Sequence, residues 1–364
     1  MATGFPTKAN WVSGDILTAA QMDDLAGTVN LLQYSAFPIM AGKNAIINGG
    51  MDIWQRGTSV AIAAATAAAN GYNADRWDTS TGASQAITIS RQPTADTTNL
   101  PNIQYCLRYQ RNSGQTGIGG LYLLQSIETA NAFPFAGKTI TFSFYARAGA
   151  NYSNAGGTLN AYVVSGTGTD QNGFSMTGAL TVGTGVNVTL TTTWQRFSYT
   201  ATVPTTATEL AASFLFTPVG TAGANDYFEI TGVQLELGST ATTFSRAGGS
   251  IGGELALCQR YYFRESGTTG QVTTGFGVAY STTNFYSAFK PKVTMRIVPT
   301  LDSYSSLQAS NGISTLAVSS AVIWTNSTVD SPSILCTTAG TFTAGTAWSL
   351  AFSGTGYVGF SAEL

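Results

Sequence analysis

Short runs of alternating hydrophobic and polar residues, separated by turn residues, fill most of the chain after Asn44. In Thr139–Arg147, Ile140, Phe142 and Phe144 fall on one side and polar residues fall between them, a period of two that predicts a strand. Nine further runs before residue 246 share strand-like composition: Ala86–Arg91, Tyr105–Tyr109, Gly120–Leu124, Leu159–Val164, Val186–Leu190, Trp194–Tyr199, Leu210–Phe216, Tyr227–Ile230 and Val233–Glu236. Many short strands without intervening helices predict an all-β jelly-roll sandwich over residues 44–246.

The pattern changes over residues 247–265, which we interpret as a helical connector. Ser250 can cap a helix, Glu254 lies in its first turn and Arg260 lies near its end, as the helix dipole favours. We expect that helix to carry five larger side chains: Leu255, Leu257, Cys258, Tyr261 and Tyr262.

Strand patterns resume after the connector, which predicts a separate distal β-domain over residues 266–364. The expected strands are Phe285–Lys290, Val293–Val298, Ala321–Trp324, Ala347–Phe352 and Tyr357–Phe360. The loops between them are rich in Ser, Thr, Asn and Gly, which offer adaptable hydrogen bonding.

Residues 1–43 form a distinct N-terminal segment with one short predicted helix. Thr18–Gln21 has the pattern of a capping box. Four apolar residues then follow heptad spacing and are the expected oligomerisation residues: Met22, Leu25, Val29 and Leu32. Because an isolated helix of ~12–15 residues is marginal in water, this one needs a partner. It either lies on its own domain or joins a short three-chain bundle.

Composition excludes several classes of protein. Charged residues make up only 9% of the chain, and the net charge of −2 gives no electrostatic footprint for nucleic acid. Since no stretch approaches the ~20 apolar residues of a membrane helix, we expect no membrane insertion. The chain has no histidine, which removes Ser-His-Asp and Cys-His nucleophile pairs and His-ligated zinc.

The cysteines are odd in number and far apart, at Cys106, Cys258 and Cys336. Without CxxC spacing they are expected to be buried thiols, not a disulfide framework. The chain start also lacks the pattern of a secretory signal. Both observations predict synthesis in a reducing cytoplasm.

Aromatic and charged residues cluster in two neighbouring phrases, Asn44–Gly57 and Gly71–Asp78: Asp52, Trp54, Arg56, Asp75, Arg76, Trp77 and Asp78. One interpretation is structural, with the two tryptophans anchoring the core and the arginines paired with the nearby aspartates. In the other interpretation, Trp54, Trp77 and Asp75 line a sugar-binding groove. The run Ala45–Ile47 before Asn48 is expected to be a strand that ends in a turn.

These two phrases, together with Val233–Gly238 and Gly253–Tyr262 in the same order, resemble a β-sandwich module of tailed-bacteriophage tail fibres and other host-contacting virion proteins. The segments Gly4–Pro6 and Trp11–Thr18 also resemble the N-termini of minor tail and fibre proteins of actinobacterial phages. The module's topology is a jelly roll of the kind seen in carbohydrate-binding modules.

The resemblance implies a virion protein made in the host cytoplasm, located in a tail fibre or tail tip rather than in the capsid. It implies a homotrimer that contacts other virion proteins through its N-terminal segment and binds host cell-surface glycan non-covalently, without being an enzyme. A mainly structural head-fibre, capsid or tail-tip decoration protein is the alternative, and a glycan-cleaving depolymerase is a further one.

Glycan cleavage would need two carboxylates about 5–9 Å apart, one of them with a raised pKa. Asp52, Asp75 and Asp78 are the best candidates, with Glu128 or Glu229 as distant partners. Nearby arginines would hold the three aspartates ionised. The chain also lacks the repeat of a parallel β-helix. We therefore expect no catalytic residues.

Two further sets of residues are candidates for ligands. Asp52 with Asp226 or Glu236 would suit Ca²⁺ where the first and last strands of a jelly roll meet, against the alternative of salt bridges with Arg56 or Arg246. No other cofactor is implied. In the distal domain, exposed aromatic side chains could stack on sugar rings: Tyr280, Tyr286, Tyr304 or Trp324. The alternative is that these four rings are ordinary core residues of the domain, and for Trp324, inside an apolar run, we expect that core position.

Overall fold

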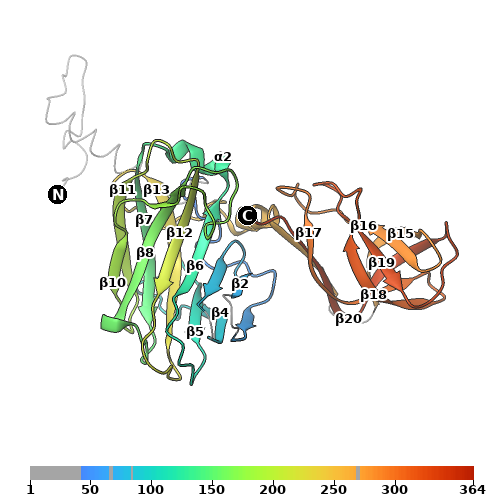
Figure 1. Ribbon diagram of the computed structural model, residues 1–364, viewed down its shortest axis with the longest axis horizontal. Coiled ribbons are helices and arrows are strands. Elements are labelled where there is room, and N and C mark those ends of the chain that lie inside the picture. Colours follow the sequence, from blue (N-terminus) through green and yellow to red (C-terminus); the bar gives the residue numbers. More distant parts are fainter. Residues whose placement is uncertain (1–41, 65–68, 83–84, 268–270) are drawn as a thin grey trace, which may run out of the picture.

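The computed structural model describes residues 42–64, 69–82, 85–267 and 271–364. Two β-domains lie along the long axis of the molecule, joined by a short helical segment, and the last residues of the chain lie between them (Figure 1). The predicted helix of the N-terminal segment, with Met22, Leu25, Val29 and Leu32, lies outside the described residues.

The first domain is a sandwich of two antiparallel sheets. One sheet has the order β1-β4-β5-β13-β7-β11. Its strands are β1 (Ser59–Ile62), β4 (Ile87–Pro93), β5 (Tyr105–Arg111), β13 (Tyr227–Leu237), β7 (Thr139–Ala148) and β11 (Gln195–Thr202).

The second sheet has the order β10-β8-β12-β6-β3-β2, with β9 added beside β8. Its strands are β10 (Val186–Thr189), β8 (Thr158–Gly166), β12 (Glu209–Phe216), β6 (Leu121–Ile127), β3 (Asp78–Thr81), β2 (Ala69–Tyr72) and β9 (Leu180–Thr181). Short helical turns occupy the loops: α2 (Thr129–Ala132), η1 (Phe133–Phe135) and η2 (Ala155–Gly157).

The alternation of β7 determines how the two sheets pack. Ile140, Phe142 and Phe144 all lie in the core between the sheets, as the period of two predicted. The polar face of the strand is also covered, because Thr141 and Ser143 are buried as well. The Thr141 hydroxyl donates to the carbonyl of Gly238, 2.8 Å away. This strand is therefore enclosed on both faces.

The expected strand at Ala45–Ile47 is wrong, whereas the turn after it is confirmed. These residues form bends and turns around Asn48, which adopts a φ of 57°. The Asn48 side chain bonds the backbone of Ile53 on both sides, accepting at 2.9 Å and donating at 2.8 Å. The first phrase is thus an ordered loop, because side-chain hydrogen bonds replace the ladder of a strand.

The connector contains α3 (Ile251–Gln259), and Ser250 caps it as predicted, accepting from the Gly253 amide. The helix is shorter than expected at its end. Tyr262 belongs to the first strand of the distal domain, β14, instead of the helix. The helix also contacts the sandwich loop, since the buried Glu254 carboxylate accepts from the Asn48 amide.

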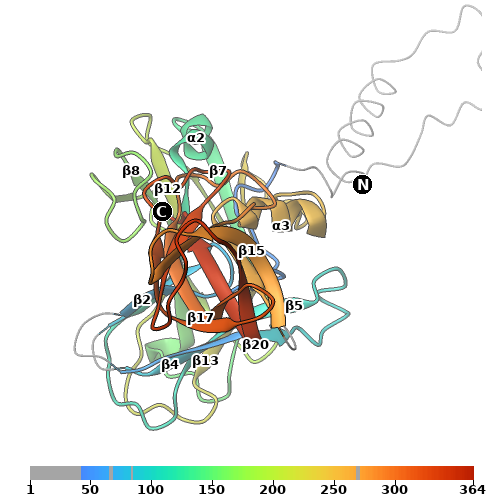
Figure 2. The ribbon, with the colours of Figure 1, turned by 90° about the vertical axis from the view of Figure 1, so that its right-hand side faces the viewer.

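The distal domain is one closed antiparallel sheet, seen from its free end in Figure 2. The order is β14-β20-β15-β16-β19-β18-β17, and β17 also pairs with β20. The strands are β14 (Tyr262–Ser266), β20 (Ala347–Ser361), β15 (Gln271–Ala279), β16 (Asn284–Ala288), β19 (Ser333–Thr338), β18 (Thr315–Ile323) and β17 (Thr300–Ser310). Its own core contains Phe285, Trp348 and Phe360.

The expected strand Val293–Val298 is also wrong, because these residues form bends between β16 and β17. Met295 is buried in the distal core. Arg296 reaches the sandwich and pairs with Asp170, 3.1 Å away. The alternating apolar residues of this segment therefore do not pair in a sheet. The segment is instead anchored by Met295 in the distal core and by Arg296 on the sandwich. The fold class is otherwise as predicted: an all-β jelly-roll sandwich followed by a distal β-domain.

Candidate functional site

Trp54 and Trp77, candidates for a sugar platform, both belong to the sandwich core. Trp77 is 0% exposed, and its ring lies 6.2 Å from that of Phe214. Each indole nitrogen donates to a backbone carbonyl of the opening loop, that of Met51 for Trp54 and that of Asn48 for Trp77. Neither ring presents a face to solvent, so in this structure both act as core anchors.

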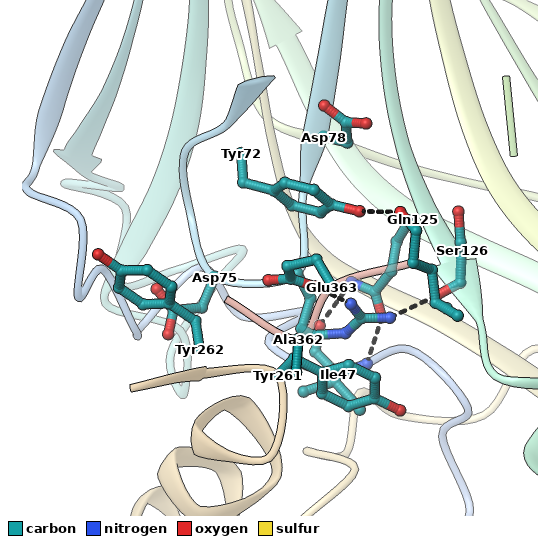
Figure 3. A network of polar contacts seen from close by, with 12 residues as sticks. Ile47, Tyr72, Asp75, Asp78, Gln125, Ser126, Tyr261, Tyr262, Ala362 and Glu363 are labelled. Carbon is teal, nitrogen blue, oxygen red and sulfur yellow. Dashed lines mark hydrogen bonds and ion pairs between the residues drawn. The ribbon is translucent and has the colours of Figure 1, made fainter. Parts of the chain in front are cut away.

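Asp75 is buried beneath the same loop and is not open to a ligand. Its carboxylate accepts hydrogen bonds from the backbone and side-chain amides of Gln55. Burial raises the pKa of Asp75 to about 6, although the charge of Arg56 and the bonds from Gln55 lower it. Figure 3 shows Asp75 and Tyr262 on one side of the junction between the domains.

The expected pairing of Arg56 and Arg76 with the nearby aspartates is wrong. Both arginines pair with Glu363, which lies near the other end of the sequence. The Arg76 guanidinium lies 3.6 Å from the ring centre of Tyr261, and that of Arg56 lies 3.5 Å from the ring centre of Tyr262. The opening phrases therefore build the contact between the two domains (Figure 3).

The chain around Glu363 is held at this junction by further hydrogen bonds. The Tyr72 hydroxyl and the Asn172 amide donate to the carbonyl of Leu364 at 2.8 and 3.0 Å. Arg296 donates to the carbonyls of Ala362 and Glu363 at 2.8 and 2.7 Å. The residues that follow the last strand of the distal domain are thus held by polar side chains of both domains.

The three calcium candidates do not come together. Asp52 pairs with Arg246 at 2.8 Å, which is one of the salt bridges given as the alternative. Asp226 pairs with Arg111 at 2.8 Å and Glu236 with Lys43 at 3.7 Å. Within the described residues, no group of three or more acidic or cysteine side chains is arranged to hold a metal ion.

The carboxylates considered for catalysis are also buried or held by cations. Burial raises the pKa of Asp78, and the Asn172 amide donates to its carboxylate. Glu128 pairs with Arg260 and accepts from the Tyr261 hydroxyl. Glu229 lies between Arg108 and Arg147 on the outer side of the first sheet. These positions serve the structure and leave no open acid–base pair among the named carboxylates.

The three cysteines are free and buried, as expected. Cys106 and Cys336 lie in different domains, and Cys258 lies on α3. Burial raises the pKa of Cys336 to about 12, and it raises those of Cys106 and Cys258 as well. The thiols are therefore uncharged and unreactive at neutral pH.

The structure brings Tyr280, Tyr286 and Trp324 together on the outer face of the distal domain. We call these three residues the ring cluster. The Trp324 ring centre lies 5.5 Å from that of Tyr280 and 6.3 Å from that of Tyr286, with the planes of the second pair 9° apart. Tyr280 is 60% exposed, and the other two side chains are half-buried.

Strand pairing explains how the cluster forms. Tyr286 on β16 lies opposite Leu335 on β19, which lies opposite Val322 on β18. Trp324 is two residues beyond Val322, hence on the same outer face. Tyr280 follows the end of β15, where its amide donates to Asn284. Three segments separated in sequence thus supply one aromatic surface.

The expected core position of Trp324 is wrong. Its apolar neighbours Ala321 and Ile323 do pack inward, but alternation places Trp324 outward. The sequence did not show which residues of this strand face the core. The pairing with β19 shows it, because Cys336 and Ile334, opposite Ala321 and Ile323, are buried in the core. Tyr304 lies elsewhere, on β17, where its hydroxyl accepts from the Ala321 amide at 3.1 Å.

No protein-family model and no curated protein matches this chain. Among solved structures, the chain is similar to the enzymatically active domain of bacteriophage CBA120 tailspike protein 4, with 14% identity, a TM-score of 0.34, and coverage of 54% of this chain and 21% of that one. It is also similar to a structure titled "CBM4 structure and function", with 16% identity, a TM-score of 0.30, and coverage of 52% and 98%.

A further similar structure is the CBM22-1 xylan-binding domain from Paenibacillus barcinonensis Xyn10C, with 12% identity, a TM-score of 0.30, and coverage of 55% of this chain and 98% of that one. The chain spans about a fifth of the length of the tailspike domain that it matches. None of the described helices has the length and apolar character that crossing a membrane requires.

Proposed function

We propose that this chain is a fibre-type virion protein of a tailed phage that attaches to host-surface glycan by non-covalent binding, mainly through its distal domain. The ring cluster is the observation that carries the proposal. Tyrosine and tryptophan supply large contact faces with few rotatable bonds, so stacking on sugar rings costs little ordering entropy.

The sequence supports the virion assignment independently of the ring cluster. Four phrases occur in the order of the fibre-associated module: Asn44–Gly57, Gly71–Asp78, Val233–Gly238 and Gly253–Tyr262. Residues of the two opening phrases build the junction that carries the distal domain, through the contacts of Arg56 and Arg76 with Glu363. We therefore infer that the sandwich is the scaffold and that the distal domain is the tip.

Non-covalent binding is favoured over cleavage by the state of the carboxylates. Asp75 and Asp78 are buried, and Glu128 and Glu229 are held by arginines. A glycosidase needs an open pair of carboxylates flanking the sugar bond. The named carboxylates do not offer one, so the proposal assigns this chain no catalytic role.

Attachment of this kind requires several tips on one fibre. Binding by a few exposed rings without ionic anchors is expected to be weak, about millimolar per site. We propose that the chain forms a homotrimer, with the N-terminal segment 1–43 joining the copies and docking them to other virion proteins. Three linked tips then raise the effective affinity without any new contact.

A glycan array probed with the full chain tests the proposal. We expect binding to at least one bacterial surface glycan, and a loss of about tenfold or more for Tyr280→Ala and for Trp324→Ala. Phe133→Ala is the matched control, because Phe133 is a 65% exposed aromatic residue on the sandwich. Equal binding by all variants would reject the ring cluster as the site.

Point substitutions are a cleaner test than removing the distal domain. A chain that ends near Glu265 also lacks Glu363, which leaves Arg56 and Arg76 without their acidic partner. Loss of adsorption by that chain would then reflect a damaged sandwich as readily as a missing tip. The point variants keep the junction intact.

A mainly structural virion role is the second candidate, and exposed apolar residues of the distal domain favour it. Phe276 is 77% exposed and Ile313 is 94% exposed, and contacts between copies or with other virion proteins would cover them. Virions labelled with antibody to this chain and viewed by electron microscopy would place it on the head or the tail. Head labelling with no glycan binding would support this second role.

A further inference from the structure

The closed sheet of the distal domain has an open seam between β17 and β18. The two strands pair only where Gln308–Ser310 meet Thr315–Ala317. On either side of the remaining gap, the first half of β17 pairs with β20 and the second half of β18 pairs with β19. A cleft of about 560 Å³, lined by Pro299–Tyr304 and Ala321–Ile323, lies along this gap. We call it the seam cleft.

Tyr304 fixes what the seam cleft can hold. Its side chain leaves β17 and its hydroxyl accepts from the Ala321 amide of β18 at 3.1 Å, so the residue bridges the seam. Its ring also packs against the distal core. A peptide strand that entered the gap to complete the sheet would have to displace this ring. The cleft therefore suits a ligand that lies over the seam.

The seam cleft and the ring cluster share one strand face. Val322 lines the cleft and is 55% exposed. Trp324 of the ring cluster directly follows β18 and lies two residues after Val322. Because residues two apart share a face of a strand, both side chains point outward. Neighbouring strands are ~4.8 Å apart, so the surface from Tyr286 across Val322 to the cleft is several strands wide. It is larger than one sugar ring stacked on the cluster.

The polar groups of the seam cleft determine the charge of a suitable ligand. Asp302 is exposed, and the Ser303 hydroxyl donates to its carboxylate at 3.1 Å. Among the residues described along the cleft, Asp302 is the only charged one, and no lysine or arginine lines it. The other walls are the apolar side chains of Leu301, Val322 and Ile323. Such a surface accepts hydroxyl or amino groups and repels carboxylates.

We propose that the seam cleft is a second subsite, and that the ligand is a neutral or amino-bearing oligosaccharide which stacks on the ring cluster and extends over Val322 to the Asp302 carboxylate. This inference rests on the proposed function and adds to it the length and charge of the glycan. Acidic polysaccharides, with uronic acid or phosphate groups, are excluded as the ligand because they would meet Asp302 with no lysine or arginine among the residues that line the cleft.

Titration of the full chain with neutral, amino-bearing and uronic-acid oligosaccharides of one to six units tests this inference. Affinity should rise by at least about tenfold from one unit to the longest neutral or amino-bearing chain, because the cleft adds contacts. Asp302→Asn should lower the affinity for long chains by about tenfold and leave single sugars unchanged. Trp324→Ala should lower both.

Glu265→Gln is the matched control, because it removes one acidic group from the same domain outside the cleft lining. If Trp324→Ala abolishes binding while Asp302→Asn behaves like this control, the second subsite is rejected and the proposed function stands. A preference for uronic-acid chains also rejects the subsite. If no oligosaccharide binds, or if Trp324→Ala binds as well as the unaltered chain, the proposed function itself fails.

Discussion

Arg76 and Glu363 form a buried ion pair across 287 positions of the sequence. Arg76 lies in the opening loops of the sandwich, and Glu363 follows the last strand of the distal domain. The same arginine donates to the carbonyl of Ser126 and lies over the ring of Tyr261. The contact therefore joins one domain's first loops to the other domain's last residues, which fixes the tip relative to its scaffold.

Glu363→Gln should destabilise the protein strongly. Glu363 is only 4% exposed, so its substitution leaves Arg76 without its acidic partner and Arg56 with only the neighbouring charge of Asp75. Breaking a buried pair in this way typically costs about 3–5 kcal/mol. Denaturant unfolding measures the change, with Glu265→Gln as the control. Glu265 and Lys292 form a more exposed pair at 3.7 Å, for which a change within about 0.5 kcal/mol is expected. Equal effects of the two substitutions would contradict the role of Glu363.

Asp75 should make stability depend on pH in a definite direction. Its folded pKa of about 6 is above the ordinary 3.8, so between these values the folded state binds more protons than the unfolded state. As the pH rises from 4 to 6, Asp75 therefore lowers the free energy of unfolding, by about 1.4 kcal/mol for each unit by which its pKa is raised. Unfolding free energies of the protein and of Asp75→Asn, measured across this range, should diverge in favour of the variant at higher pH. A constant difference would show that the pKa is not raised.

Trp77→Ala and Trp324→Ala should separate a structural from a functional tryptophan. Trp77 is enclosed in the sandwich core, and its truncation should cost about 3–5 kcal/mol. Trp324 is half-buried on the surface, and its truncation should cost much less while glycan binding is lost. Thermal unfolding and array binding measured on both variants decide this. If the Trp77→Ala protein keeps its melting temperature but loses cell adsorption, Trp77 is a ligand-binding residue and not a core anchor.

Gly49→Ala should disrupt the opening loop. A Cβ atom on Gly49 would lie 2.1 Å from the carbonyl oxygen of Val233, which is backbone and cannot move aside cheaply. Overpacking of this kind costs about 1–3 kcal/mol. Gly71→Ala is the control, since no atom lies within 4 Å of the added carbon. Comparable melting temperatures of the two variants would mean that the loop adjusts freely.

The oligomeric state should depend on the N-terminal segment. Light scattering of the full chain at micromolar concentration should give three times the chain mass of 37.9 kDa, because the short seam of Met22, Leu25, Val29 and Leu32 is stable only with partners. A chain that begins at Gly42 should be monomeric. A monomeric full chain would refute the trimer, and a trimeric shortened chain would place the contacts in the β-domains.

The sequence by itself determined the class of fold, because strand alternation is a local property. The faces of Thr139–Arg147 and the cap of α3 at Ser250 follow from side-chain spacing and from the free amides at a helix start. The clustering of Trp54 and Trp77 with charged residues also identified an important region. It did not say whether that region binds a ligand, since burial depends on what covers it.

The tertiary structure alone decided which charges pair and which rings meet. Arg76 has three aspartates nearby in sequence, yet its partner is Glu363, because chain closure brings the last strand back to the first loops. Similarly, Trp324 lies in an apolar run, and only pairing with β19 fixes the phase that turns it outward beside Tyr286. Contacts between distant segments depend on the register of whole sheets, a property that no local pattern contains.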